Sequence, residues 1–431
     1  MKNYKDENVY NASIKRIDYI FKNFEKIYIS FSGGKDSGVM LNLVIDYMRS
    51  NNIKTKVGLM IMDNEANYTL SLEYMHRIIK SNLDILDVHW CCLPITLPCT
   101  VSSYEIEWRC WGLEEKNSWI RPMPKEDYIV NTENHKYPFF KNNMQYHDFW
   151  DSFGEWYSEG KNCACLIGIR TDESLNRYRA IMNENKEMHN GNIWTKKNGK
   201  NVYNCYPIYD WKTEDVWIAN GKFDWDYNKL YDIFWKSGMT IAQMRVASPF
   251  MSESKSSLNM YRIIDPQVWS RLCARVSGAN FFATYGKAIN YNSFKLPEGH
   301  TWKSFVKFLI NTLPESSAEN FKIRFIQSIK YWWRVGRGLP QNIINQLKEN
   351  NVYFKIGGKT RHGNKNLDTV RMLPQQHCDY LKSNKSDVTS WKRFAMTILK
   401  NDHTCKYLGL APTKQQLDRM KFLKQKYKNV K

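Results

Sequence analysis

The sequence predicts an α/β protein with a parallel five-stranded sheet, followed by a basic and mainly helical C-terminal region. Three observations favour this fold class. Apolar runs typical of strands alternate with helical patterns over residues 1–235, a Gly-Gly turn joins the first such strand to a helix, and the chain becomes helical and basic after Pro314. Strand–helix alternation forms parallel sheets covered on both faces, with ligands at the carboxyl ends of the strands.

The elements follow from the apolar pattern. We expect strands at residues 26–32, 56–63, 85–92 and 163–169 and a short fifth strand that leads into residues 206–208, with helices over residues 36–50 and 68–79. A long irregular insertion, rich in proline and tryptophan, occupies residues 93–160. Long loops beside a ligand site are typically lids. The expected domains are therefore a nucleotide-binding domain at 1–235 with this lid, a connecting region at 236–310 and a C-terminal domain at 311–431.

Composition restricts the class of protein. The 431 residues suffice for two or three domains. No apolar run reaches membrane-spanning length and the N-terminus is polar, so we expect a cytoplasmic protein with no membrane partner. Ten cysteines in a reducing compartment do not predict disulfides.

The positive charge is concentrated in the last third of the chain. Residues 1–310 hold 39 Lys and Arg against 35 Asp and Glu, whereas residues 311–431 hold 24 against 8. Such segregation favours contact between residues 311–431 and a polyanion, most simply DNA or RNA. The alternative is a solvated basic face without a partner.

The segment at 30–37 predicts a phosphate site. A strand ends here, two adjacent glycines follow, and a helix begins, so backbone N–H groups and the positive end of a helix dipole point at one place. The glycines permit close backbone approach and the lysine adds charge. The alternative is a capped Gly-Gly turn. The candidate phosphate-binding residues are Ser30, Ser32, Gly33, Gly34, Lys35, Asp36 and Ser37.

The letters SGGKDS at 32–37 do not fit a Walker A loop, in which the glycines stand apart. They resemble the PP-loop of the ATP pyrophosphatase superfamily, which includes phosphoadenosine phosphosulfate (PAPS) reductases. The resemblance implies a sheet of the adenine nucleotide alpha-hydrolase type, with ATP or PAPS as the bound adenine nucleotide.

Two later segments resemble the PAPS reductase branch. Residues 168–177 are similar to its G-[IL]-R-x-x-E-S-x-x-R segment, and residues 206–217 to its P-[IL]-x-x-W-x-x-x-D-V-W signature. Arginine forks suit phosphate or sulfate, although an arginine four residues after a glutamate also fits a surface pair. The segment at 168–177 adds Gly168, Arg170, Glu173 and Arg177 to the expected nucleotide site. The catalytic candidates are Lys35, Asp36 and Arg170.

Two acidic residues carry further expectations. Asp63 ends the second strand and matches loosely the D-T-G-x-x-F stretch of the reductases, which implies a place beside the adenosine. Asp36 lies in the first helical turn, where it either holds Mg²⁺ between phosphates or serves as a plain helix acid.

The chain also departs from the reductases. It lacks their C-terminal E-C-G-[LI]-H motif with the nucleophilic cysteine, and it lacks the C-x-x-C pairs of iron–sulfur versions, so no iron–sulfur cluster is expected. Cys163 and Cys165 alternate along a buried strand, which favours packing. A zinc site at His377, Cys378, His403 and Cys405 fits no established spacing.

Over its whole length the chain resembles a PAPS reductase-like subgroup with a C-terminal domain of unknown function, which includes the bacterial co-activator IbrA. That resemblance implies a ParB/sulfiredoxin-like protein partner. The leading hypothesis is an enzyme that cleaves the α–β bond of ATP and adenylylates a substrate or partner. The alternatives are a true PAPS reductase and a nucleotide-sensing regulator that acts on nucleic acid.

Overall fold

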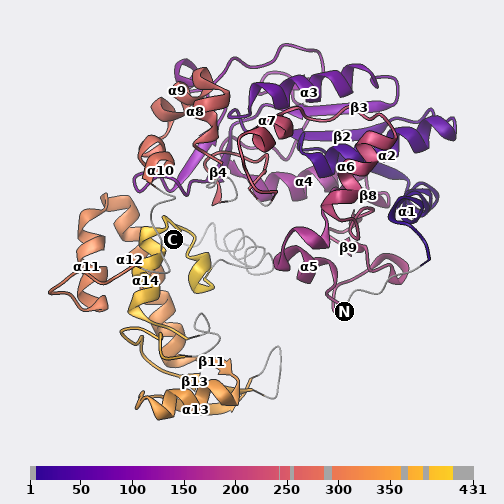
Figure 1. Cartoon of the computed structure of the whole chain (residues 1–431). Coiled ribbons are helices and arrows are strands. Elements are labelled where there is room, and N and C mark those ends of the chain that lie inside the picture. Colours follow the sequence, from indigo (N-terminus) through magenta and orange to yellow (C-terminus); the bar gives the residue numbers. More distant parts are fainter. Residues whose placement is uncertain are drawn as a thin grey trace. The chain divides into compact units, whose positions relative to one another are not determined.

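The computed structural model describes residues 6–241, 243–252, 257–285, 294–360, 367–381 and 388–410 (Figure 1). The chain packs as two compact units. The first contains Met1–Leu97 and Glu107–Val276, and the second contains Pro98–Ile106 and Ser277–Lys431. The division at Val276 falls inside the connecting region expected from sequence. A short piece of the expected lid packs in the second unit.

The first unit is built on a seven-stranded sheet of order β6-β3-β2-β1-β8-β10-β9. Its five central strands are the predicted parallel ones, so the α/β fold class is confirmed. The bounds are β3 (Leu86–Cys91), β2 (Val57–Met62), β1 (Lys26–Ser30), β8 (Cys163–Ile167) and β10 (Val202–Cys205). The short fifth strand, expected to lead into residue 206, is β10, which ends at Cys205. At the edges, β6 (Ile129–Val130) pairs parallel with β3, and β9 (Thr195–Lys197) pairs antiparallel with β10.

The central strands are apolar because both faces of the sheet are covered. All six residues of β2 are buried, as are the three middle residues of β1. The chain adds β2 and β3 on one side of β1 and then returns to add β8 and β10 on the other. The strand order thus reverses between β1 and β8. Ligands of open α/β sheets bind at the carboxyl ends of the strands at such a switch point.

The described residues of the first unit form nine α-helices, several of which connect and flank this sheet (Figure 1). The most deeply buried is α2, with ten buried residues. Their bounds are α1 (Val9–Asn23), α2 (Lys35–Ser50), α3 (Thr69–Lys80), α4 (Tyr146–Ser158), α5 (Leu175–Ile181), α6 (Thr213–Lys222), α7 (Leu230–Lys236), α8 (Met260–Ile264) and α9 (Pro266–Arg275).

The insertion at 93–160 is ordered around a second, small sheet of order β5-β4-β7. Its strands are β4 (Ile95–Pro98), β5 (Glu107–Cys110) and β7 (Met144–Gln145). Buried Glu65 fixes the insertion to the end of β2, because its carboxylate accepts hydrogen bonds from the amides of Trp111 (2.6 Å) and Ile120 (2.8 Å). The proline- and tryptophan-rich stretch is thus packed structure.

The second unit is mainly helical, as expected, with an antiparallel sheet that the sequence did not predict. Two buried apolar clusters form its interior, one around Phe321 and Phe394 and the other around Ile343 and Val370. The helices are α10 (Ala279–Tyr285), α11 (Trp302–Thr312), α12 (Glu315–Arg334), α13 (Gln341–Glu349) and α14 (Trp391–Leu399). The strands are β11 (Arg337–Leu339), β13 (Asp368–Arg371) and β12 (Lys355–Lys359), in that order across the sheet. Among the described residues, no helix has the length and apolar character needed to cross a membrane.

Candidate functional site

The loop between β1 and α2 forms the centre of the site. Gly33 has a φ of +69°, a conformation that favours glycine, and Gly34 precedes the first residue of α2. The amides of Asp36 and Ser37, in the first turn, donate to no acceptor within the described ranges. Free amides and the helix dipole together favour an anion at this helix start.

The loop serines shape the loop itself. Ser37 Oγ donates to the carbonyl of Gly34 at 3.1 Å and lies 3.0 Å from Ser32 Oγ. Ser32 Oγ in turn accepts from the amide of Gly34 at 3.4 Å. These contacts hold the backbone of the loop in one conformation, which keeps the helix amides facing outward.

Two cations meet one carboxylate beside the loop. Lys35 Nζ lies 2.8 Å from Asp36 Oδ2, and Arg170 Nε donates to Asp36 Oδ1 at 2.6 Å. Lys35 and Asp36 are largely buried, and the Arg170 side chain is only 2% exposed. The cluster keeps a net positive charge, which suits a phosphate-rich ligand.

Arg170 is placed as a positioning residue. Besides Asp36, its guanidinium donates to the carbonyl of Trp211 and to Thr213 Oγ1. The sequence led us to expect a phosphate clamp at Arg170. The observed partners favour an indirect role, in which Arg170 orients Asp36 and Asp36 orients Lys35.

Glu173 and Arg177 make contacts within their own segment, residues 168–177. Glu173 accepts from the Arg170 amide at 3.1 Å and forms an ion pair with Arg177, four residues later. In the structure Arg177 is therefore paired with Glu173, as the alternative of an i,i+4 pair predicts. A direct contact between Arg177 and the nucleotide stays a prediction.

Gly168 brings the end of β8 against the start of α2. A Cβ at this position would lie 2.8 Å from both Cα and N of Ser37, which is closer than real Cβ atoms approach. The backbone of Ser37 cannot move away without moving the loop. Gly168 thus sets the distance between the two segments of the site.

Asp63 is fully buried and bonded within the chain. Its Oδ2 accepts from Trp90 Nε1 at 2.7 Å and pairs with Arg121 of the insertion, while its Oδ1 accepts from the Glu65 amide at 2.8 Å. These contacts favour a structural role over the expected place beside the adenosine. Glu65, at the glycine of the reductase pattern, has a φ of +64°.

The role of Asp36 as a magnesium ligand stays a prediction. Magnesium prefers carboxylate oxygens, and in this arrangement each oxygen of Asp36 accepts from one cation. Within the described ranges, no group of three or more His, Cys, Asp or Glu side chains is arranged to hold a metal ion. The cysteines and histidines at 377–405 therefore form no such group. We therefore derive no step through magnesium.

The cysteines are poor nucleophiles. All ten are free thiols and nine of them are buried, Cys273 being partly exposed. Burial raises the pKa of Cys91, Cys165 and Cys405 to about 12, and that of Cys378 to about 11. A thiolate is the reactive form, so these cysteines stay protonated near neutral pH.

Sequence reasoning missed two residues that contact the loop from the α7 side. The Tyr231 hydroxyl accepts from the Lys35 amide at 3.1 Å, and Asn228 Nδ2 donates to the Gly33 carbonyl at 2.9 Å. Beside them lies an apolar cavity of about 330 Å³ that Lys35 borders together with Trp217, Tyr227, Tyr231, Asp232, Trp235, Ile241 and Met244. The dense run of aromatic residues after Trp217 was the available sequence signal.

Together the fold and the loop define a PP-loop protein of the PAPS reductase-like type, and family comparisons agree. Residues 116–237 match the phosphoadenosine phosphosulfate reductase domain, and residues 238–419 match a domain of unknown function, DUF3440. A curated relative, "Uncharacterized protein YbdN" of Escherichia coli (strain K12), is 30% identical over 416 residues, which is 95% of this chain and 92% of that protein. The chain belongs to the family of YbdN, with a PAPS reductase-like domain and a DUF3440 domain.

Solved structures with related folds match more weakly. The FMN adenylyltransferase of Candida glabrata, in complex with FAD and inorganic pyrophosphate, matches with a TM-score of 0.32 and 14% identity, over 53% of this chain and 64% of that one. The PAPS reductase of Candida auris, as a phosphate complex, matches with a TM-score of 0.28 and 9% identity, over 57% and 97%.

Proposed function

We propose that this protein binds ATP at residues 32–37 and transfers the adenylyl group to an acceptor, releasing pyrophosphate. The observation that carries the proposal is the start of α2, where Lys35 and the free amides of Asp36 and Ser37 meet at the switch point of the sheet. Amides, a helix dipole and a lysine form the combination that holds a polyphosphate.

The chemistry is an in-line displacement at the α-phosphorus. A nucleophilic oxygen of the acceptor attacks phosphorus, the bond to the α,β-bridging oxygen breaks, and its electron pair leaves with pyrophosphate. Lys35 and the amides neutralise charge on the leaving group, and the Asp36–Arg170 pair keeps Lys35 in place. The protein thus contributes position and charge.

Reduction of PAPS is the weaker alternative. That reaction needs a thiolate near the sulfonucleotide, and nine of the ten cysteines have a pKa raised, chiefly by burial. The C-terminal reductase motif is also absent from the sequence. A regulator that contacts nucleic acid is favoured only by the charge of residues 311–431, and a ParB/sulfiredoxin-like partner only by the resemblance to the subgroup.

Incorporation of labelled pyrophosphate into ATP tests the proposal, with the full chain and a small-molecule extract as the source of acceptor. We expect exchange in the natural protein and its loss in Lys35→Ala, because that variant removes the Lys35 ammonium group from the loop. Lys161→Ala, at an exposed lysine before β8, is the matched control. Equal exchange in Lys35→Ala and the control would contradict the role of the loop, and sulfite release from PAPS would favour the reductase.

A further inference from the structure

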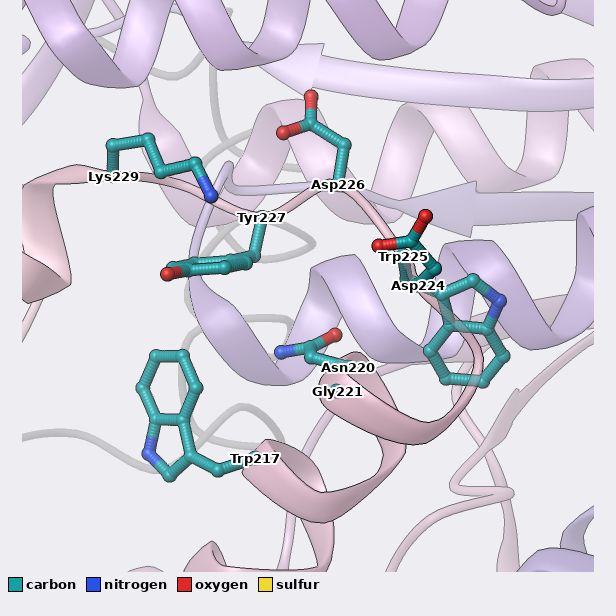
Figure 2. Close-up of a pocket in the computed structure, with 8 residues that line it drawn as sticks. All are labelled: Trp217, Asn220, Gly221, Asp224, Trp225, Asp226, Tyr227 and Lys229. Carbon is teal, nitrogen blue, oxygen red and sulfur yellow. The ribbon is translucent and has the colours of Figure 1, made fainter.

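A second cavity, of about 490 Å³, lies at the end of α6 and the loop that follows it (Figure 2). Its volume is in the range of small-molecule sites. The lining residues are Trp217, Asn220, Gly221, Asp224, Trp225, Asp226, Tyr227 and Lys229. None of these belongs to the predicted phosphate site.

The amide of Asn220 is the feature that points to a ligand. The residue is 5% exposed, and both Nδ2 and Oδ1 are buried without a hydrogen-bond partner in the described chain. Figure 2 shows this amide facing the space between the Trp217 and Tyr227 rings. An unpaired buried donor or acceptor is destabilising, and such groups are normally paired. A ligand with one acceptor and one donor side by side would satisfy both atoms.

The walls of the cavity suit a flat ring. The Trp217 and Tyr227 ring centroids lie 5.5 Å apart at 82°, so these rings contact each other edge to face, and a flat ligand ring can stack on a free face of one of them but not between them. Trp225 is held in place by a 2.8 Å hydrogen bond to Asp46. Lys229 Nζ lies 3.6 Å from the centre of the Tyr227 ring, which puts a cation near the opening.

We propose that this cavity is a second nucleotide site that binds adenine, with Asn220 paired to the 6-amino group and N7 of the base. Asparagine pairs with these two adenine atoms through two hydrogen bonds. Inosine and guanine present two acceptors on the same edge and satisfy only the Asn220 Nδ2 donor. Stacking on Trp217 or Tyr227 adds affinity, as aromatic side chains do for bases in general.

The second site is separate from the loop at 32–37. Its loop contacts the middle of α2, where Asn42 Nδ2 donates to the Asp226 carbonyl and Asp46 accepts from Trp225. Asp46 lies eleven residues after Lys35, which is about 16 Å along a helix. Lys35 itself does not line this cavity, although Trp217 and Tyr227 also form part of the cavity of about 330 Å³ that Lys35 borders.

Equilibrium dialysis of the full chain with labelled adenosine tests the second site, because a nucleoside carries no phosphate for the loop to hold. We expect one bound adenosine per chain and at least tenfold weaker binding in Asn220→Leu. Asn345→Leu, at an exposed asparagine of α13, is the matched control and should bind as the natural protein does. Binding that survives in Asn220→Leu, or that is lost equally in Asn345→Leu, would overturn the proposal.

Competing nucleosides test the same assignment in the natural protein, without a variant. Inosine should compete about five- to 150-fold less well than adenosine, the range of one lost base contact. Equal competition by inosine would refute adenine recognition.

The source of the base is resolved by two further probes, AMP and a twelve-residue deoxyadenosine oligonucleotide. Tighter and salt-sensitive binding of the oligonucleotide assigns the site to single strands, and comparable binding assigns it to free nucleotides. Failure of both to displace adenosine would overturn the proposal.

Discussion

Asp36 joins the two cations of the candidate site, so single side chains there have effects beyond their own contacts. Its carboxylate is the partner of Lys35 and of the buried Arg170. Removing one partner of a buried ion pair leaves an uncompensated charge. The stability of the loop and its charge are therefore coupled through one residue.

Asp36→Asn tests this coupling. We expect the free energy of unfolding to fall by about 3–5 kcal/mol, because Arg170 loses its charged partner inside the protein, and ATP affinity to fall as well. Urea unfolding measures the first effect. Asp18→Asn, in the exposed pair with Lys22, is the control and should change stability by less than about 1 kcal/mol. Equal changes would argue against a structural Asp36–Arg170 pair.

Gly168→Ala tests the close approach of β8 to α2. The new methyl group meets the Ser37 backbone at 2.8 Å, so the loop has to shift, and we expect weaker nucleotide binding with a lower unfolding temperature. Gly358→Ala, in open space on β12, is the control. Nucleotide affinity that is the same in both variants would contradict the fixed spacing.

The raised pKa values of the buried thiols can be tested by their reactivity. Because burial raises the pKa of Cys91, Cys378 and Cys405 to between about 11 and about 12, few thiolates exist at pH 8. We expect a thiol-specific disulfide reagent to react slowly with the folded protein, first at partly exposed Cys273, and with all ten thiols in guanidinium. Cys273→Ser should remove the first phase. A rapid reaction that persists in this variant would indicate an activated cysteine and support the reductase.

The sequence motifs identified the candidate site residues but not the residues to which they are hydrogen-bonded. The resemblance named Lys35, Asp36, Gly168 and Arg170, and the structure brings these four together. It could not show that Arg170 faces inward, because burial and hydrogen-bond direction depend on distant residues such as Trp211.

At the scale of elements, the insertion is fixed to β2 by buried charge. Arg121 pairs with Asp63, and Glu65 accepts two insertion amides. Both carboxylates are 0% exposed, so their partners are needed for stability. Residues 107–160 of the insertion therefore fold as part of the first unit.

Arg121→Met is expected to loosen this attachment, because it leaves the Asp63 charge unpaired in the interior. Limited proteolysis should then cut within residues 107–160 at lower protease concentration than in the natural protein. Lys125→Met, four residues along at an exposed lysine, controls for the loss of a surface cation. A cleavage pattern unchanged in Arg121→Met would show that other contacts hold the insertion.

Long buried elements were predictable and short ones were not. The apolar runs that became β1, β2, β3 and β8 are five or six residues long, and all but β3 are buried along most of their length. The two edge strands have only two and three residues, too few to show a period. The sheet of the second unit escaped notice because β12 is mostly exposed.

At the scale of the whole molecule, charge segregation remains the main sequence signal without a structural test. Exposed cations Lys322, Lys330 and Arg334 lie on α12. If residues 311–431 contact nucleic acid, affinity falls linearly on logarithmic axes as salt rises.

Reversal of these three charges to Glu in the full chain should reduce the slope of affinity against salt by up to about three units, one per lost phosphate contact. Reversal of Lys15, Lys22 and Lys80 in the first unit is the matched control and should leave the slope unchanged. Equal slopes in all proteins would favour a solvated basic face without a nucleic-acid partner.

The path of the chain between its two units limits how the protein can be divided. Pro98–Ile106 packs in the second unit, where the Ser103 carbonyl accepts from Ser317 and the Ser102 carbonyl is bonded to His403. A fragment that begins at residue 277 lacks this segment, and one that ends at residue 276 leaves it without its packing partners. A gene split or fusion between the two regions would therefore interrupt a folded unit, so the two regions are expected to be inherited together.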